Sequence, residues 1–205
     1  MTAKTSKGIP KALDRREVVR MLLARRGKLL VIAGLGAPAW DATDAGDHAL
    51  NFPLWGGMGG AATIGLGLAL AQPERRVLVL TGDGELLMGM GSLATIGAHA
   101  PRNLSVVVLD NERYGETGMQ ASHTAFGVDL AGVAKACGFA CASMLTTIEE
   151  VDRLRADLHR AEGPLFAQVK VAADKLPLVL PPRDGAYLKD RFREALLGKQ
   201  AHFQS

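Results

Sequence analysis

The chain has 205 residues and a formal net charge of +3, and 48% of its residues are hydrophobic. Such a length can bury a real core but is close to the size of a single domain. Lys and Arg form no obvious run, so we expect no nucleic-acid partner. The longest apolar stretch, residues 58–71, is too short and too rich in glycine to cross a bilayer. The composition therefore favours one soluble domain without a membrane partner.

Two further features of the sequence indicate the cellular compartment of the protein. The first 20 residues are polar and charged and lack the apolar segment of a signal peptide. The two cysteines, Cys137 and Cys141, lie on or beside one predicted helix, and no second Cys or His pair accompanies them. We therefore expect buried, reduced thiols, no metal site at the cysteines, and a cytoplasmic protein.

Helical and strand-like patterns alternate along the chain. After a polar leader at residues 1–13, a helix is predicted from Asp14, with apolar residues 18, 19, 22 and 23 on one face. A strand at 29–33 leads into a glycine-rich exit loop at 34–38. The next helix starts near Met58, is built of small residues and ends before Pro73. The further predicted elements are strands at 77–80, 104–109, 140–144 and 165–171, and helices at about 87–99, 130–137, 148–161 and 186–197.

This alternation predicts an α/β fold, with a parallel sheet and helices on both faces. The core domain is expected over residues 14–175. Prolines at 177, 181 and 182 then end the core, so residues 176–205 are predicted to be a proline-containing tail with a terminal helix.

Polar residues follow two of the predicted strands. Gly82-Asp83-Gly84 lies at the carboxyl end of one strand, where open α/β sheets bind ligands. Its glycines let the backbone approach an anion, and the carboxylate of Asp83 suits Mg²⁺. Asn111 follows the next strand and offers an amide oxygen. Mg²⁺ prefers an octahedron completed by phosphate oxygens, so these few protein ligands would suffice. A tight turn and an ordinary loop are the alternative.

The two motifs together resemble the thiamine diphosphate (ThDP) signature, in which GDG is followed, after a helix and a strand, by a pair of Asn residues. The resemblance implies a ThDP- and Mg²⁺-binding domain. Its metal ligands would be Asp83, Asn111 and the main-chain carbonyl of Arg113. The pair reads Asp110-Asn111 here, and the departure at Asp110 falls on a position that is not an expected ligand.

Further cofactor contacts follow from the same resemblance. The segment from Leu54 to Gly60 is similar to the segment that grips the aminopyrimidine ring, with the carbonyl of Gly56, and the amide and side chain of Met58, as contacts. Met58 would wedge ThDP into a bent shape, and a core methionine filling a gap is the alternative. The remaining expected contacts come from the exit loop and from backbone near the diphosphate. They are Gly36, Ala37, Gly84, Glu85, Gly115 and Glu116.

The chain has almost no room for a second domain. ThDP enzymes use one domain for the diphosphate and metal, and a related one for the pyrimidine that carries an activating glutamate. Only the diphosphate-binding (PP) domain is accounted for here. The resemblance therefore implies a separately encoded pyrimidine-domain (alpha) subunit that supplies this glutamate, in an assembly of two of each chain or more.

The reaction is inferred from the run from Asn111 to Thr124, which is similar to the corresponding loop of sulfopyruvate and phosphonopyruvate decarboxylases. The resemblance implies a PP (beta) subunit of an enzyme that releases CO2 and an aldehyde from a small 2-oxo acid. Candidate catalytic residues are Thr117, Gln120 and His123, and a histidine can donate a proton or contact an anion. Pyruvate decarboxylases have a glutamate where this chain has Thr117. A polar surface loop is the alternative for these residues.

Two other functions are consistent with the same motifs. The alternative enzyme is the PP subunit of a ThDP-dependent 2-oxoacid oxidoreductase or carboligase. A non-catalytic ThDP-binding regulatory or assembly subunit would also keep the cofactor pocket.

Overall fold

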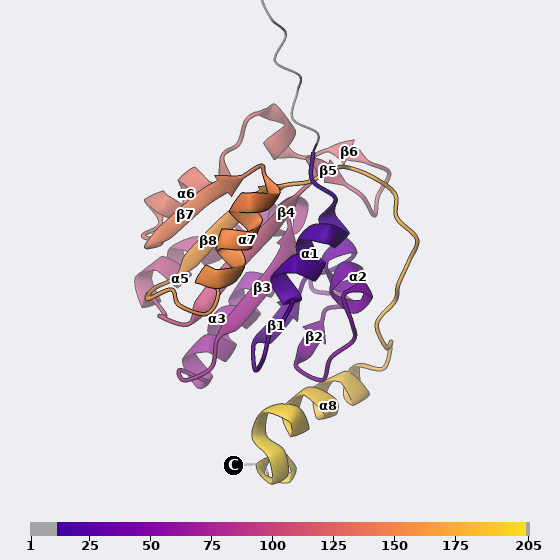
Figure 1. Cartoon of the computed structure of the whole chain (residues 1–205), viewed down its shortest axis with the longest axis vertical. Coiled ribbons are helices and arrows are strands. Elements are labelled where there is room, and N and C mark those ends of the chain that lie inside the picture. The colour runs from indigo at the N-terminus through magenta and orange to yellow at the C-terminus, as the bar shows by residue number, and fades with distance from the viewer. Residues whose placement is uncertain (1–11, 204–205) are drawn as a thin grey trace, which may run out of the picture.

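A six-stranded parallel sheet forms the centre of the computed structural model, which describes residues 12–203 (Figure 1). The strand order is β2-β1-β3-β4-β8-β7. The strands, in that order, are Asn51–Pro53, Leu30–Ala33, Val77–Gly82, Leu104–Asp110, Leu165–Lys170 and Cys141–Leu145. Each neighbouring pair is parallel. The predicted parallel α/β fold is therefore confirmed.

Helices cover both faces of the sheet, as predicted, because the strands are apolar on both sides. Side chains of β3 alternate between two cores, with Val77 and Val79 in one and Leu78 and Leu80 in the other. The first core is closed by α3 (Ala61–Ala71), α5 (Ser92–His99) and α6 (Leu130–Ala136). The second is closed by α1 (Arg15–Leu23), α2 (Ala37–Asp44) and α7 (Ile148–Asp157). The predicted apolar face of α1 is fully buried.

The helix predicted over about residues 87–99 ends at His99 as predicted, but its predicted start is wrong. The structure instead has α4 (Asp83–Met88), a break at Gly89, and then α5. A Cβ on Gly89 would lie 2.0 Å from the carbonyl oxygen of Gly59, so the two backbones touch there. The break thus packs against the loop before α3, which itself begins at Ala61 rather than at Met58.

Three further regions contain short elements that were not predicted. The exit loop at 34–38 already contains the start of α2, because Pro38 is compatible with the first turn of a helix. The edge strand β2 has only three residues. A small antiparallel hairpin joins β5 (Arg113–Tyr114) to β6 (Gln120–Ala121), and the 3-10 helix η1 (His123–Phe126) follows it. All three carry too few residues for a periodic pattern.

The chain after β8 remains in contact with the domain. We call residues 172–184 the C-terminal strap; in Figure 1 it runs along the outside of the molecule from β8 to α8 (Gly185–Leu197). Nη1 of Arg15 donates to the carbonyl of Asp174 at 3.2 Å, and Trp55 donates to the carbonyl of Pro182 at 2.7 Å. Helix α8 then packs beside β2, where the rings of Phe52 and Phe192 lie 5.6 Å apart.

The cysteines and the N-terminal leader differ from the predictions or lie partly outside the described residues. Cys141 is exposed and Cys137 only partly covered, so the prediction of buried thiols is wrong. Most of the predicted leader at 1–13 lies outside the described residues, and Leu13 forms a bridge to Val171. Within residues 12–203, no helix combines the length and the apolar character needed to cross a membrane.

Candidate functional site

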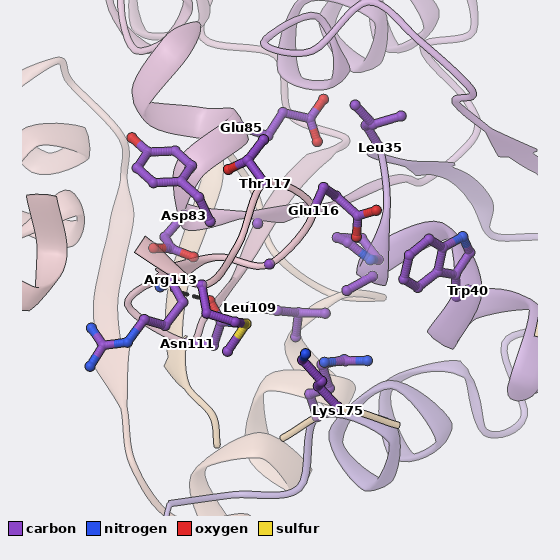
Figure 2. A pocket seen from close by; sticks show the side chains of 18 of the residues that line it. Leu35, Trp40, Asp83, Glu85, Leu109, Asn111, Arg113, Glu116, Thr117 and Lys175 are labelled. Carbon is purple, nitrogen blue, oxygen red and sulfur yellow. Dashed lines mark hydrogen bonds between the residues drawn. The ribbon is translucent and has the colours of Figure 1, made fainter. Parts of the chain in front are cut away.

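A cavity of about 530 Å³ opens at the carboxyl ends of β3 and β4. Open α/β sheets bind ligands at this edge. Figure 2 shows Asp83 and Asn111 along one side, with Glu85 and Lys175 at opposite ends. Ten of the residues predicted from the sequence line this cavity. They are Ala37, Met58, Asp83, Gly84, Glu85, Asn111, Arg113, Gly115, Glu116 and Thr117.

The other predicted residues lie outside the lining. Gly36 is buried just behind it, where a Cβ would lie 2.9 Å from Oε1 of Glu116. Gly56 is exposed at the rim, in the same loop as Met58. Gln120 and His123 are exposed on the hairpin and on η1. The structure thus separates two of the three predicted catalytic residues from the cavity wall.

Asp83 is a buried carboxylate at the first position of α4. Its Oδ2 accepts hydrogen bonds from the hydroxyls of Ser122 and Thr124. Burial raises the pKa of Asp83, the hydrogen bond from Ser122 opposes this, and the charge of Asp110 raises the pKa further. No basic side chain in the described part of the chain pairs with it. A cation bound at Asp83 would therefore supply the missing counter-charge.

Asn111 and Arg113 form the second side of the same site. Oδ1 of Asn111 accepts from the backbone amide of Arg113 at 3.0 Å, and Glu112 between them has a positive φ of 61°. This tight turn fixes both the amide oxygen and the following main chain. Figure 2 shows the guanidinium of Arg113 extending away from the cavity, so its main chain is what the turn presents. Carboxylate, amide and carbonyl oxygens are the donor set that a hard divalent cation takes.

Glu85 lies at the other end of the cavity and is also buried. Oε2 accepts from the hydroxyl of Thr81 at 2.9 Å, while Oε1 has no hydrogen-bond partner of normal geometry among residues 12–203. Burial raises the pKa of Glu85, opposed by Thr81 and by nearby backbone amides at Ala61, Leu35 and Gly59. A Cβ on Gly34 would lie 1.8 Å from Oε2. Glu85 therefore joins three backbone segments around the cavity.

The loop between β5 and β6 covers the cavity with polar side chains. The hydroxyl of Thr117 donates to Oε1 of Gln120 at 3.0 Å, and Nε2 of Gln120 donates to the carbonyl of Thr117 at 2.8 Å. Nδ1 of His123 lies 3.5 Å from the hydroxyl of Tyr114. The ring of Tyr114 packs on Gly84, where a Cβ would lie 2.5 Å from a ring carbon. Thr117 and Gln120 therefore contact each other, whereas His123 contacts Tyr114.

Several residues that shape the site were not predicted, or were predicted in another role. Ser122 was not predicted, and Thr124 was a candidate substrate or gate residue; both donate to Asp83, and Thr124 lies 2.7 Å from Oδ1 of Asp110. Oδ2 of the fully buried Asp110 accepts from Gln168 at 2.6 Å and from Lys170 at 2.9 Å. Their sequence positions carry no motif, but an Asp in a buried strand is a signal for a buried partner. Arg15 and Lys175, from beyond the predicted motifs, complete the wall.

A parallel sheet with oxygen donors and close backbone around a cavity at its carboxyl edge is the arrangement of an open α/β ligand-binding domain. The chain belongs to the thiamine pyrophosphate enzyme family, because residues 36–169 match the family's C-terminal TPP binding domain. The resemblance inferred from the two motifs is thereby confirmed.

Two relatives match most of this chain. The chain is 37% identical over 187 residues to the sulfopyruvate decarboxylase subunit beta of Methanothermobacter thermautotrophicus, a match that covers 91% of this chain and 97% of that one. It is 38% identical over 164 residues to the phosphonopyruvate decarboxylase of Streptomyces viridochromogenes, covering 80% of this chain but 41% of the relative. These relatives are named as decarboxylases.

A solved structure supports the fold. Benzoylformate decarboxylase from Polynucleobacter necessarius is similar with a TM-score of 0.71 at 20% sequence identity. The match covers 87% of this chain and 36% of that one, so this chain spans about a third of the solved protein.

Proposed function

We propose that this chain is the PP (beta) subunit of a two-chain, ThDP- and Mg²⁺-dependent 2-oxoacid decarboxylase. Its substrate would be sulfopyruvate, phosphonopyruvate or a similar small 2-oxo acid, and its products CO2 and an aldehyde. The observation that carries this proposal is the match that covers 97% of a sulfopyruvate decarboxylase beta subunit. The name of that relative states a reaction, and the cavity described above is where this chain would contribute to it. When bound, ThDP supplies the electron sink that allows a 2-oxo acid to lose CO2.

The metal and diphosphate would be held where β3 and β4 end. Asp83, Asn111 and the carbonyl of Arg113 would bind Mg²⁺, since all three positions border one cavity. The backbone of Gly84 and Glu85 on one side, and of Gly115 and Glu116 on the other, would face the diphosphate. Gly36 and Ala37, at the start of α2, would approach it from the end of β1.

The aminopyrimidine ring would lie against the loop before α3. Gly56 would contact the ring through its carbonyl and Met58 through its amide, while the side chain of Met58 would bend the cofactor. Met58 suits this role because its side chain lines the cavity and remains 38% exposed, so no packed core holds it.

The hairpin loop would meet the substrate. Thr117 lines the cavity and is tied to Gln120 by two hydrogen bonds, so the pair would act together as a gate over the reacting atoms. His123 would donate a proton or contact the substrate anion, and its contact with Tyr114 would orient the imidazole.

The partner would be the pyrimidine-domain subunit that carries the activating glutamate, with two of each chain or more. Two uncharged segments beside the cavity support this, because residues 54–71 and 86–98 contain no charged side chain and meet where the backbones of Gly59 and Gly89 touch. We call them the uncharged surface; Arg183 of the strap lies 5.8 Å from the Trp55 ring beside it. Large apolar side chains are exposed there: Trp55, Met58, Ile64, Leu70, Met88 and Met90. Exposed apolar surface of this kind marks protein contacts, and Met58 joins it to the cavity.

Calorimetry would test the cofactor site. Titrating ThDP and Mg²⁺ into the chain together with a pyrimidine-domain chain should show binding. The Asp83→Ala variant should bind ThDP and Mg²⁺ more than about tenfold more weakly. Loss of a residue that only supports a metal ligand already costs about tenfold, and Asp83 would be a ligand itself. Asp190→Ala, an exposed position on α8, is the matched control. Equal binding by Asp83→Ala and the wild type would contradict the proposal.

Product analysis would distinguish the reaction from the alternatives. A decarboxylase releases CO2 and an aldehyde in equal amounts. A carboligase would join two substrates, an oxidoreductase would need an electron acceptor, and a regulatory subunit would bind ThDP without turnover. Screening 2-oxo acids that carry a sulfonate, a phosphonate or neither would identify the substrate.

A further inference from the structure

One end of the cavity is built by segments outside the matched family domain. The match spans residues 36–169, whereas Arg15 comes from α1 and Lys175 from the C-terminal strap. Figure 2 shows Lys175 at the end of the cavity opposite Glu85, beyond the side where Asp83 and Asn111 lie. Segments before and after the matched domain therefore each contribute a cation to the cavity that the candidate metal ligands also line.

Arg15 is held in place by the surrounding structure. It is 7% exposed, and its Nε lies 2.5 Å from Oδ2 of the fully buried Asp41. Nη1 donates to the carbonyl of Asp174, so the same guanidinium fixes the strap immediately before Lys175. A guanidinium is planar and always charged, and it has five N–H donors. Two of its nitrogens are used in these contacts, and the third can bind an anion at the cavity.

Charges of both signs surround Arg15, and the carboxylates of Glu116 and Asp174 line the same cavity. Arg16 also pairs with Asp41, and both Arg16 and Arg20 pair with Asp44, so three guanidiniums share two carboxylates. The charge of Arg15 also lowers the pKa of Glu116, against the larger effect of burial, which raises it. Arg15 therefore acts electrostatically on groups at the cavity wall as well as on Asp41.

We propose that Arg15 and Lys175 bind the terminal phosphate of the cofactor, so that α1 and the strap complete the diphosphate site. This inference rests on the proposed function, because it requires the diphosphate to lie beside Asp83 and Asn111. Arg15 is the fixed, nearly buried contact, and Lys175 is an exposed cation that the strap holds over the same end. Lys175 closes the site from the segment that follows β8.

Affinity for cofactors with different phosphate content tests the proposal. ThDP, thiamine monophosphate and thiamine would each be titrated by calorimetry, with Mg²⁺ and a pyrimidine-domain chain, into the wild type and Lys175→Met. We expect Lys175→Met to weaken ThDP binding about fivefold to tenfold, as for loss of a partly exposed charge-assisted hydrogen bond. Thiamine binding should be unchanged, because thiamine carries no phosphate.

The controls separate phosphate binding from general effects. Lys189→Met removes an exposed lysine of α8 and should leave all three affinities unchanged. Lys175→Glu should weaken ThDP binding more than Lys175→Met, and Lys175→Arg should largely restore it. Arg15→Met would remove the second contact, but it also breaks the pair with Asp41, so Lys175 provides the decisive variants.

The outcomes are distinct. If the wild type binds no ThDP, the proposed function itself fails. If the wild type binds ThDP and Lys175→Met changes its affinity by less than about twofold, Lys175 is a solvated surface lysine and the inference is overturned. A fall of equal size for ThDP and thiamine would also overturn it, because the effect would then not depend on phosphate.

Discussion

Asp110 and Lys170 are partners across the parallel strands β4 and β8, and Nζ of Lys170 lies 2.9 Å from Oδ2 of Asp110. The carboxylate is fully buried, whereas the lysine side chain is 25% exposed. The same ammonium also pairs with Glu112, which lies between Asn111 and Arg113. The pair explains how an aspartate is accommodated where the ThDP signature has an asparagine.

Lys170→Met should destabilise the fold strongly. It leaves the buried charge of Asp110 without a counter-charge, and breaking such pairs typically costs about 3–5 kcal/mol of unfolding free energy. Because Lys170 is partly exposed, the lower part of that range is expected. The double variant Asp110→Asn with Lys170→Met should recover most of the loss in a denaturant titration. Equal destabilisation of the single and double variants would show that the charge of Asp110 is not the cause.

Gly34→Ala should disturb the cavity through Glu85. The added Cβ would lie 1.8 Å from Oε2 of Glu85, which must then move away from Thr81. Overpacking of this kind costs about 1–3 kcal/mol, and we expect both the melting temperature and ThDP affinity to fall. Gly185→Ala is the matched control, since its Cβ meets nothing within 4 Å. A Gly34→Ala protein with wild-type stability and affinity would contradict the observed packing.

The capping box of α7 gives a pH-dependent stability. The pKa of Glu150 is lowered from its ordinary value of 4.5, chiefly by the hydrogen bond from the backbone amide of Thr146. A lowered pKa in the folded state stabilises the fold above the unfolded value, and this stabilisation is lost as the pH falls through the folded pKa.

Glu150→Gln should therefore be less stable than the wild type at neutral pH, and the difference should shrink in acid. Denaturant titrations at several pH values would measure it. A difference that stayed constant between about pH 7 and about pH 3 would show that the ionised carboxylate does not stabilise α7.

A substitution on the uncharged surface beside the cavity should affect association with the partner chain and not the stability of the fold. Met88 is 69% exposed, so Met88→Lys should change the unfolding free energy by less than about 0.5 kcal/mol. The same substitution should prevent association with the pyrimidine-domain chain, measured by analytical ultracentrifugation. Met144→Lys, an exposed methionine on the edge strand β7, is the matched control and should assemble normally. Normal assembly of Met88→Lys would place the partner elsewhere.

The sequence predicts the long periodic elements well, for physical reasons that the structure makes plain. The strand with Val77 to Leu80 is apolar throughout because both of its faces are buried. The glycines did not predict where this helix breaks. The apolar pattern predicted one helix across Gly89, but the structure has a break there, because the backbone of Gly89 touches that of Gly59, which is remote in the sequence.

The candidate site also contains both residues that the sequence predicts and residues that it does not. Asp83 and Asn111 belong to a two-part motif whose strand context places them together, and the cavity contains both. Arg15 and Lys175 carry no motif and reach the cavity only through tertiary structure. Gln120 and His123 were predicted as catalytic candidates from the resemblance of their loop to that of related decarboxylases, yet both are exposed outside the cavity lining, Gln120 on β6 and His123 on η1.

The central claim is that this chain supplies half of an active site. The most direct measurement is CO2 release from a 2-oxo acid with ThDP and Mg²⁺, by the chain alone, by a pyrimidine-domain chain alone and by the two mixed. Turnover with aldehyde formation is expected in the mixture only, and it should be lost when Asp83→Ala replaces the wild type. Full turnover by the isolated chain would contradict the account.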